Sequence, residues 1–270
     1  MSINHYENFP VASVLLPAHL RGPVASIYRF ARAADDFADE GDLPDRERLA
    51  LLAGFGDELR MIERGEPSRV DLFKELAPVI KAYQLPLNLF HDLLSAFAQD
   101  VTKKRYADLT EVLDYCRRSA NPIGRLLLAL YGAATPQNNA WSDNICSSLQ
   151  IINFLQDIAI DCRKDRIYMP QDDLAQFNLS EVQIAAQDTG GRWRDFMTFQ
   201  VDRTRRMLWE GAPLGRVLKG RIGLEMRMII AGGDRILSKI LVAGCDVFHH
   251  RPVLRAYDWP LMLIRTLSIR

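Results

Sequence analysis

The stretch that decides the fold is LQIINFLQDIAIDCRKDRIYMP, residues 149–170. Asn153, Asp157 and Asp161 recur in it at a spacing of four, so on an α-helix they form one polar line. Most of the other positions are Ile, Phe or Leu, which makes such a helix apolar over most of its circumference. The pattern predicts a helix at the centre of a helical bundle, with its polar line facing a cavity.

A second acidic stretch, ARAADDFADEGD at residues 31–42, follows the end of another apolar segment. Asp35 and Asp39 are four residues apart, so on a helix their Cβ atoms lie ~5 to 6 Å apart and the carboxylates repel each other. Such a pair by itself is typical of a solvated surface helix. Together with the polar line at residues 153–161, it predicts two carboxylate helices that face each other across one cavity.

Carboxylates at the edge of a core need partners, because an unpaired buried charge is costly. No lysine or arginine lies among residues 149–161 of the central helix, so we expect divalent cations instead. Mg²⁺ prefers oxygen ligands, takes one or two carboxylates per ion and is completed by water and substrate phosphates. The pattern therefore predicts a site that grips a diphosphate and ionises an allylic or cyclopropylcarbinyl ester.

Three further side chains fit such a site. Arg32 and Arg166 flank the two acidic motifs and could donate to diphosphate oxygens from the rim, with helix-surface salt bridges as the alternative. Tyr28 is one helical turn before Arg32 and is expected either in the cavity or in the core. Class I terpene cyclases and chain-elongating prenyltransferases fit this description equally well.

The rest of the chain has helical periodicity throughout and predicts an all-α fold. We find no repeat, linker or composition shift, which predicts a single domain over residues 1–270. We expect helices, bounded by prolines and glycines, over 23–40, 44–65, 72–83, 86–101, 110–119, 122–133 and 141–164, and from 180 to 240 with breaks near 188–191 and 210–215; a shorter one closes the chain.

Composition excludes several functional classes. The 34 basic residues balance the 34 acidic ones, so no overall field favours nucleic acid. The four cysteines lack metal-finger spacing and no leader precedes the first motif, which predicts reduced thiols in the cytoplasm. No uncharged apolar run reaches the ~20 residues that a transmembrane helix needs.

Three segments in this order resemble the squalene and phytoene synthase family over nearly the whole chain: YRFARAADDFADE (28–40), YCRRSANPIGRLLL (115–128) and NFLQDIAIDCRKDRIYMP (153–170). The resemblance implies an isoprenoid-synthase helical bundle around a central apolar cavity. It implies diphosphate binding by Arg32 and Arg166, and a reacting centre lined by Tyr28 and Tyr115. The Mg²⁺ ligands that it implies are Asp35, Asp39, Asn153, Asp157 and Asp161.

The opening HYENFPVASVLLP, residues 5–17, resembles the branch of this family that serves bacterial hopanoid biosynthesis. That likeness implies conversion of presqualene diphosphate to hydroxysqualene with release of diphosphate. Water rather than hydride captures the final cation there, so no NADPH is expected. We expect His5 and Phe9 to contact the substrate, and Asn8, with His5 and Glu7, to orient the capturing water; the alternative is that HYEN only caps and packs an N-terminal segment.

Two positions depart from the wider family. YENF stands where many members have Ser-x-Ser-Phe, and Gln156 stands where an arginine often precedes the second motif. Both changes reduce the donors or positive charge available for phosphate. We therefore expect the site to bind one diphosphate, as in presqualene diphosphate, rather than two.

The resemblance also bears on partners. A C30 substrate is expected to enter from lipid, which predicts peripheral contact with the inner face of the membrane without a spanning helix. We expect four apolar residues in the core or along the tunnel for the isoprenoid tail: Met226, Met228, Ile229 and Ile230. Other enzymes of the hopanoid pathway are further candidate partners, and nucleic acid is not.

Alternative functions stay open at this point. A head-to-head synthase that condenses two farnesyl diphosphates into presqualene diphosphate, squalene or phytoene would share every aspartate. A terpene cyclase is disfavoured by the order of the motifs. A non-catalytic assembly protein of the same family would lose the metal aspartates, whereas all four are present here.

Overall fold

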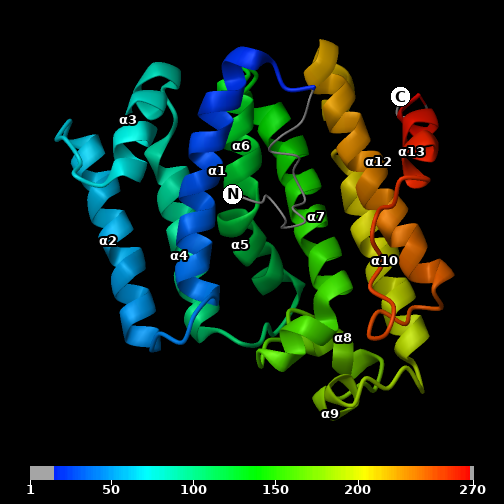
Figure 1. The fold of residues 1–270 in the computed structure, drawn as a ribbon. Coiled ribbons are helices and arrows are strands. Elements are labelled where there is room, and N and C mark those ends of the chain that lie inside the picture. The colour runs from blue at the N-terminus through cyan, green and yellow to red at the C-terminus, as the bar shows by residue number, and fades with distance from the viewer. Residues whose placement is uncertain (1–14, 268–270) are drawn as a thin grey trace.

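The computed structural model describes residues 15–267, and in this range the chain forms α-helices and no β-strand. A single bridge between Arg105 and Ile167 is the one β-type pairing within it. The all-α prediction is confirmed (Figure 1). The helices are α1 (Ala18–Asp39), α2 (Asp45–Glu63), α3 (Asp71–Tyr83), α4 (Leu87–Thr102), α5 (Leu109–Ser119), α6 (Asn121–Leu130), α7 (Pro136–Arg163), α8 (Gln171–Gln176), α9 (Glu181–Ala185), α10 (Trp193–Glu210), α11 (Leu214–Val217), α12 (Gly220–Val242) and α13 (Asp258–Thr266).

Two helix starts differ from the prediction. α1 begins at Ala18, so Pro23 lies inside the helix rather than at its first position. Pro23 is the sixth residue of α1, so the hydrogen bond that its N–H would donate to the His19 carbonyl is lost, and the helix continues through this position. α7 begins at Pro136, before the expected Trp141, because the Thr135 side chain caps it by accepting a hydrogen bond from the Asn138 N–H.

The second half of the chain is more divided than predicted. The breaks near 188–191 and 210–215 are confirmed, and the helix that closes the described chain is α13. The short helix α8 was missed, and α12 begins only at Gly220 after the single turn of α11. Six-residue and four-residue helices carry too little periodicity to be recognised in a sequence.

The long helix α7 lies between two groups of helices (Figure 1). On one side, α1 to α4 and part of α6 build a core rich in Leu and Phe; on the other, α7 packs with α10 and α12 around a second core. Ile152, Leu155 and Ile158 of α7 are buried in the second core, which confirms the central position expected for this helix. The polar line of α7 therefore lies between the two cores.

No helix among residues 15–267 is both long and apolar enough to cross a bilayer. The four cysteines are free thiols, as predicted.

Candidate active site

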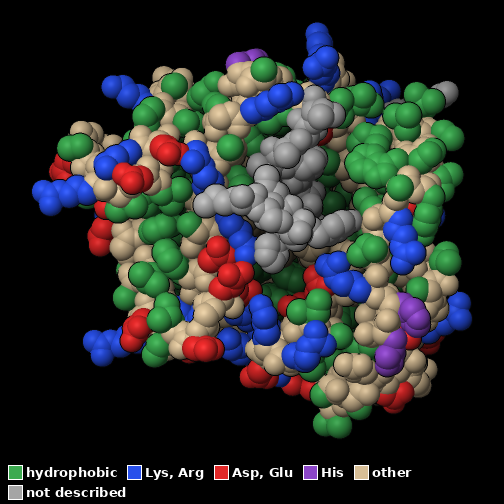
Figure 2. Space-filling model, viewed as in Figure 1, with side chains coloured by type: hydrophobic (Ala, Val, Ile, Leu, Met, Phe, Trp, Pro, Cys, Tyr) green, Lys and Arg blue, Asp and Glu red, His purple; other side chains and the backbone are tan. Residues whose placement is uncertain are grey.

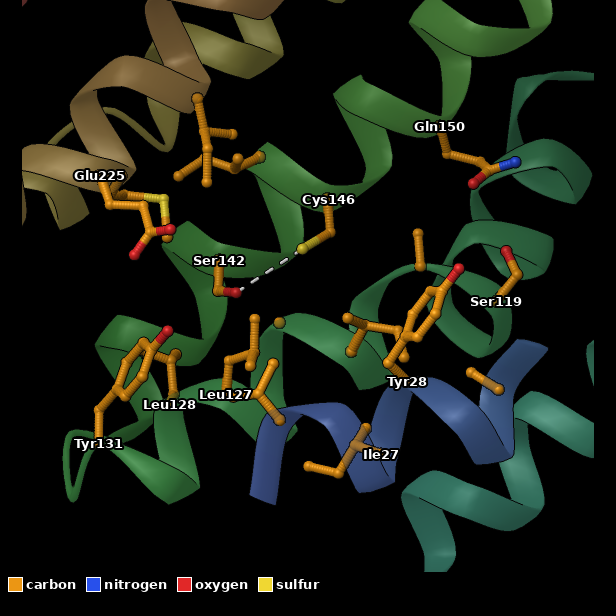
Figure 3. Close-up of a pocket in the computed structure, with 18 of the residues that line it drawn as sticks. Ile27, Tyr28, Ser119, Leu127, Leu128, Tyr131, Ser142, Cys146, Gln150 and Glu225 are labelled. Atoms are coloured by element: carbon orange, nitrogen blue, oxygen red, sulfur yellow. Dashed lines mark hydrogen bonds between the residues drawn. The ribbon is translucent and has the colours of Figure 1, made fainter. Parts of the chain in front are cut away.

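An apolar chamber of about 300 Å³ lies between the two cores, walled by α1, α6, α7 and α12 (Figure 3). Tyr28, Arg32, Asp35 and Asn153 line it, so the two predicted motifs do face one cavity. Met226 and Ile229 of α12 also line the chamber, as expected of a tunnel for an isoprenoid tail.

The two acidic motifs meet through Asp39, one helical turn beyond Asp35 of the chamber wall. Arg166 donates from Nη1 to Asp39 Oδ1 at 2.5 Å, and Lys164 Nζ lies 3.3 Å from Asp39 Oδ2. Burial pushes the pKa of Asp39 upward, but Arg166 and Lys164 outweigh it and hold that pKa below its usual value. Asp39 therefore has two cationic partners, because the chain after α7 turns back across α1.

Asp35 and Asp161 lack such a partner of matching strength. Burial, followed by the charge of Asp39, raises the pKa of Asp35 to about 7, with Arg32 opposing. The Asp35 side chain is 41% exposed, and it lines the wall of the chamber. Burial and Asp157 raise the pKa of Asp161 to about 7 in the same way, with Arg166 opposing. Both carboxyls therefore lie where additional positive charge is favoured.

Asp157 is paired with Arg251, a residue that no sequence motif had indicated. Arg251 donates from Nη2 to Asp157 Oδ2 at 3.0 Å, across a separation of 94 residues. Gln156 points away from the chamber and donates to the Pro252 carbonyl at 2.5 Å. Arg251 reaches the motif from the loop between α12 and α13, but it is paired with Asp157, so the expected shortage of donors for phosphate at Gln156 stays a prediction.

Arg32 is engaged within its own helix, as the salt-bridge alternative anticipated. Its Nη2 lies 2.7 Å from both Asp36 Oδ1 and Glu40 Oε1, while its Nη1 lies 3.4 Å from Asp35 Oδ2. Because Arg32 also lines the chamber, it remains within reach of a ligand there. Arg166 has a further donor available for a ligand, since its buried Nε has no hydrogen-bond partner in the described part of the chain.

Asp100 is a buried residue that sequence reasoning missed. It accepts hydrogen bonds from the hydroxyls of Tyr115 at 2.6 Å and Tyr168 at 3.0 Å, and burial raises its pKa to about 6. The available signal was a lone carboxylate in the apolar run AFAQDV of α4. Tyr115 is thereby placed in a buried cluster and not among the residues that line the chamber, and its role at a reacting centre stays a prediction.

Replacing Tyr168 by Phe is expected to lower the free energy of unfolding by about 1–3 kcal/mol, because buried Asp100 loses one of its two donors. The ring stays, so the stack on Phe154, with centroids 3.8 Å apart, is retained. Urea unfolding measures the change. The half-buried Tyr83 of α3 supplies the control, Tyr83→Phe, and equal stability of the two variants would contradict the assignment.

His5, Glu7, Asn8 and Phe9 lie outside the described residues, so their predicted contacts with substrate and water stay predictions. The structure instead shows polar side chains of the chamber that were not singled out. Figure 3 shows Tyr28, Ser119 and Gln150 at one end and Tyr131 with Glu225 at the other. The Ser119 hydroxyl is buried and has no hydrogen-bond partner among residues 15–267.

The residues present fit Mg²⁺ by their chemistry. Asp35, Asp161 and Asn153 offer hard oxygen donors, and two of them carry raised pKa values that a nearby cation would lower. In the described part of the chain no three His, Cys, Asp or Glu side chains lie close enough to hold one ion together.

Comparison with known proteins places these features in context. A profile of the squalene/phytoene synthase family matches residues 3–258. The hydroxysqualene synthase of Rhodopseudomonas palustris is 38% identical over 238 residues, 87% of this chain and 79% of that protein. The hydroxysqualene synthase of Zymomonas mobilis is 39% identical over 229 residues, 83% of this chain and 75% of that protein.

The crystal structure of squalene synthase HpnC from Alicyclobacillus acidocaldarius superposes with a TM-score of 0.83. Its sequence is 35% identical, and the superposition covers 89% of this chain and 90% of that one. The helical architecture is thus shared with a solved relative.

Proposed function

The chain belongs to the squalene/phytoene synthase family, and from this premise we propose that it converts presqualene diphosphate to hydroxysqualene in a Mg²⁺-dependent reaction. The relatives named hydroxysqualene synthase support this choice within the family. The observation that carries it is the junction of the two aspartate motifs, through Asp39 and Arg166, one helical turn beyond Asp35 of the chamber wall.

The junction of the two motifs holds the diphosphate. Arg166 presents a buried guanidinium with a free Nε donor, and Arg32 lines the chamber wall close by. Asp35, Asp39, Asn153, Asp157 and Asp161 are the residues that would hold Mg²⁺. The chemistry supplied by the bound ions is Lewis-acid neutralisation of the diphosphate as the C–O bond breaks.

The chamber then determines how the carbocation left by C–O cleavage reacts. Its walls are largely Leu, Ile, Val and Ala, which exclude bulk water from an intermediate that would otherwise react at once. Ser119 and Gln150, beside Tyr28, offer polar groups that can orient one water molecule. Overall, one water adds to the rearranged carbon skeleton, its proton is released, and diphosphate leaves. No hydride donor enters this balance.

The deciding assay incubates the protein with Mg²⁺ and no NADPH, separately with presqualene diphosphate and with farnesyl diphosphate, and analyses products by mass. We expect hydroxysqualene from presqualene diphosphate alone. Condensation of farnesyl diphosphate would instead place the chain among the head-to-head synthases. Absence of turnover with both substrates, and of any thermal stabilisation by Mg²⁺ with a diphosphate analogue, would favour a non-catalytic member.

The place of the enzyme in the cell follows from its substrate. A C30 diphosphate and its alcohol product partition into lipid, so we propose a cytoplasmic protein with peripheral contact at the inner face of the membrane. Enzymes that supply presqualene diphosphate and consume hydroxysqualene in hopanoid biosynthesis are its proposed neighbours.

A further inference from the structure

Helix α13 turns its apolar side away from the protein. Asp258, Met262 and Thr266, spaced by four, are its buried residues and face α12. Two of these three are polar, whereas the large hydrophobic residues lie on the opposite side. This side, the C-terminal apolar face, comprises Tyr257 (59% exposed), Trp259 (57%), Leu261 (51%), Leu263 (55%), Ile264 (63%) and Leu267 (80%).

Specific contacts fix this orientation. Asp258 is fully buried and accepts hydrogen bonds from Arg235 Nε at 2.7 Å and from the Arg255 N–H at 2.8 Å, and it pairs with Lys239. Met262 fits against Gly232, where a Cβ would lie 3.2 Å from the Met262 Cε. Rotating α13 to hide its apolar face would expose these contacts and bury hydrophobic residues where no room exists. The buried contacts of Asp258 and Met262 therefore keep the C-terminal apolar face exposed.

Within its own segment α13 has exposed charges of one sign, while the neighbouring α10, whose Trp209 ring lies under Arg265, carries exposed Asp202 and Glu210. Over residues 220–267, all of which are described, the exposed Lys, Arg, Asp and Glu side chains are all arginines: Arg221, Arg251, Arg255 and Arg265. The acidic residues of this segment are buried or half-buried, and the two nearest α13, Asp234 and Asp258, each pair with two cations. A chain with no net charge thus carries a positive, apolar face.

We infer that α13 docks in the plane of an anionic phospholipid bilayer. Trp and Tyr among exposed Leu and Ile, with arginines at the rim, are the side chains that bind the boundary between headgroups and acyl chains. Nine residues span about 13 Å, enough to lie in that boundary and too short to cross it. A second copy of the chain is a poorer occupant, because two such faces would oppose like charges.

Figure 2 shows hydrophobic side chains gathered at the upper right, over the part of the molecule where Figure 1 places α12 and α13. α12 is the wall between the chamber and α13, since Met226 and Ile229 line the chamber and Gly232 contacts Met262. Docking would therefore bring the chamber wall alongside the acyl chains. The inference concerns the surface alone and holds whichever reaction the chamber performs.

The test is co-sedimentation of the full chain with vesicles of phosphatidylcholine, with and without phosphatidylglycerol. We expect binding that requires phosphatidylglycerol and weakens with salt. Ile264→Asp should lower the partition coefficient about tenfold or more, because an apolar side chain in the interface is replaced by a charge that the lipid repels. Val182→Asp, on α9 at a position 78% exposed, is the matched control.

A second pair of variants separates charge from apolar contact. Arg255→Glu should weaken binding to phosphatidylglycerol vesicles, whereas Arg46→Glu, exposed at the far side of the molecule on α2, should not (Figure 1). Trp259→Ser repeats the apolar test without adding charge. Three outcomes would overturn the inference. The first is no binding of the unchanged protein to anionic vesicles, and the second is binding of Ile264→Asp and Trp259→Ser as strong as that of the unchanged protein. The third is a dimer that forms without lipid and that Ile264→Asp separates.

Discussion

Asp35→Asn is expected to lower kcat by about 10² to 10³-fold while leaving the protein folded. The carboxylate lines the chamber beside Arg32 and is one of the two groups whose pKa burial and neighbouring charge raise to about 7. An amide of the same shape removes the negative charge that would hold Mg²⁺ and keeps the packing. The measurement is turnover of presqualene diphosphate at saturating Mg²⁺.

Asp35→Asn is expected to lower activity but not stability. A carboxyl whose pKa rises from 3.8 on folding binds protons more tightly in the folded state, so it costs stability progressively as pH rises from about 4 to 7. Without Mg²⁺, Asp35→Asn should therefore melt at or above the temperature of the unchanged protein at neutral pH. Asp57→Asn, an exposed position on α2, is the control and should alter neither activity nor melting. Loss of activity together with a lower melting temperature would indicate misfolding rather than loss of a metal ligand.

Gly223→Ala is expected to lower the free energy of unfolding by at least about 3 kcal/mol. A Cβ at this position would lie 1.9 Å from the Leu218 carbonyl oxygen and 3.1 Å from that of Gly215. Both atoms belong to backbone, so no side-chain rotation relieves the clash, and the start of α12 must shift. Because this part of α12 carries Met226 into the chamber, turnover should fall as well.

The matched control is Gly54→Ala on α2, where a Cβ would meet nothing within 4 Å. Alanine lowers the backbone entropy of the unfolded chain and favours the helix, so this variant should be more stable by about 0.5–1 kcal/mol. Urea denaturation of both variants compares them directly. A Gly223→Ala protein as stable as Gly54→Ala would mean that the junction between α11 and α12 is looser than the structure shows.

Much of the fold could be predicted because helical periodicity is local. The spacing of four among Asn153, Asp157 and Asp161, and between Asp35 and Asp39, placed each set on one helix face without knowledge of the partner helix. The chamber is lined by Asp35 and Asn153, one residue of each set, whereas Asp39, Asp157 and Asp161 are not among its lining residues. The predictions failed at helix starts, where a cap such as Thr135 or a proline inside α1 decides the boundary.

What the tertiary structure alone decided are the contacts between distant segments. The pairs Asp39 with Arg166 and Asp157 with Arg251 join residues 127 and 94 positions apart, and the buried cluster on Asp100 joins three separate segments. The outward apolar side of α13 belongs to the same class, since its pattern predicted a helix but not which side would face α12. Helix formation depends on neighbours within a few residues, whereas ion pairing and burial depend on which helices pack together, and only the assembled bundle determines that.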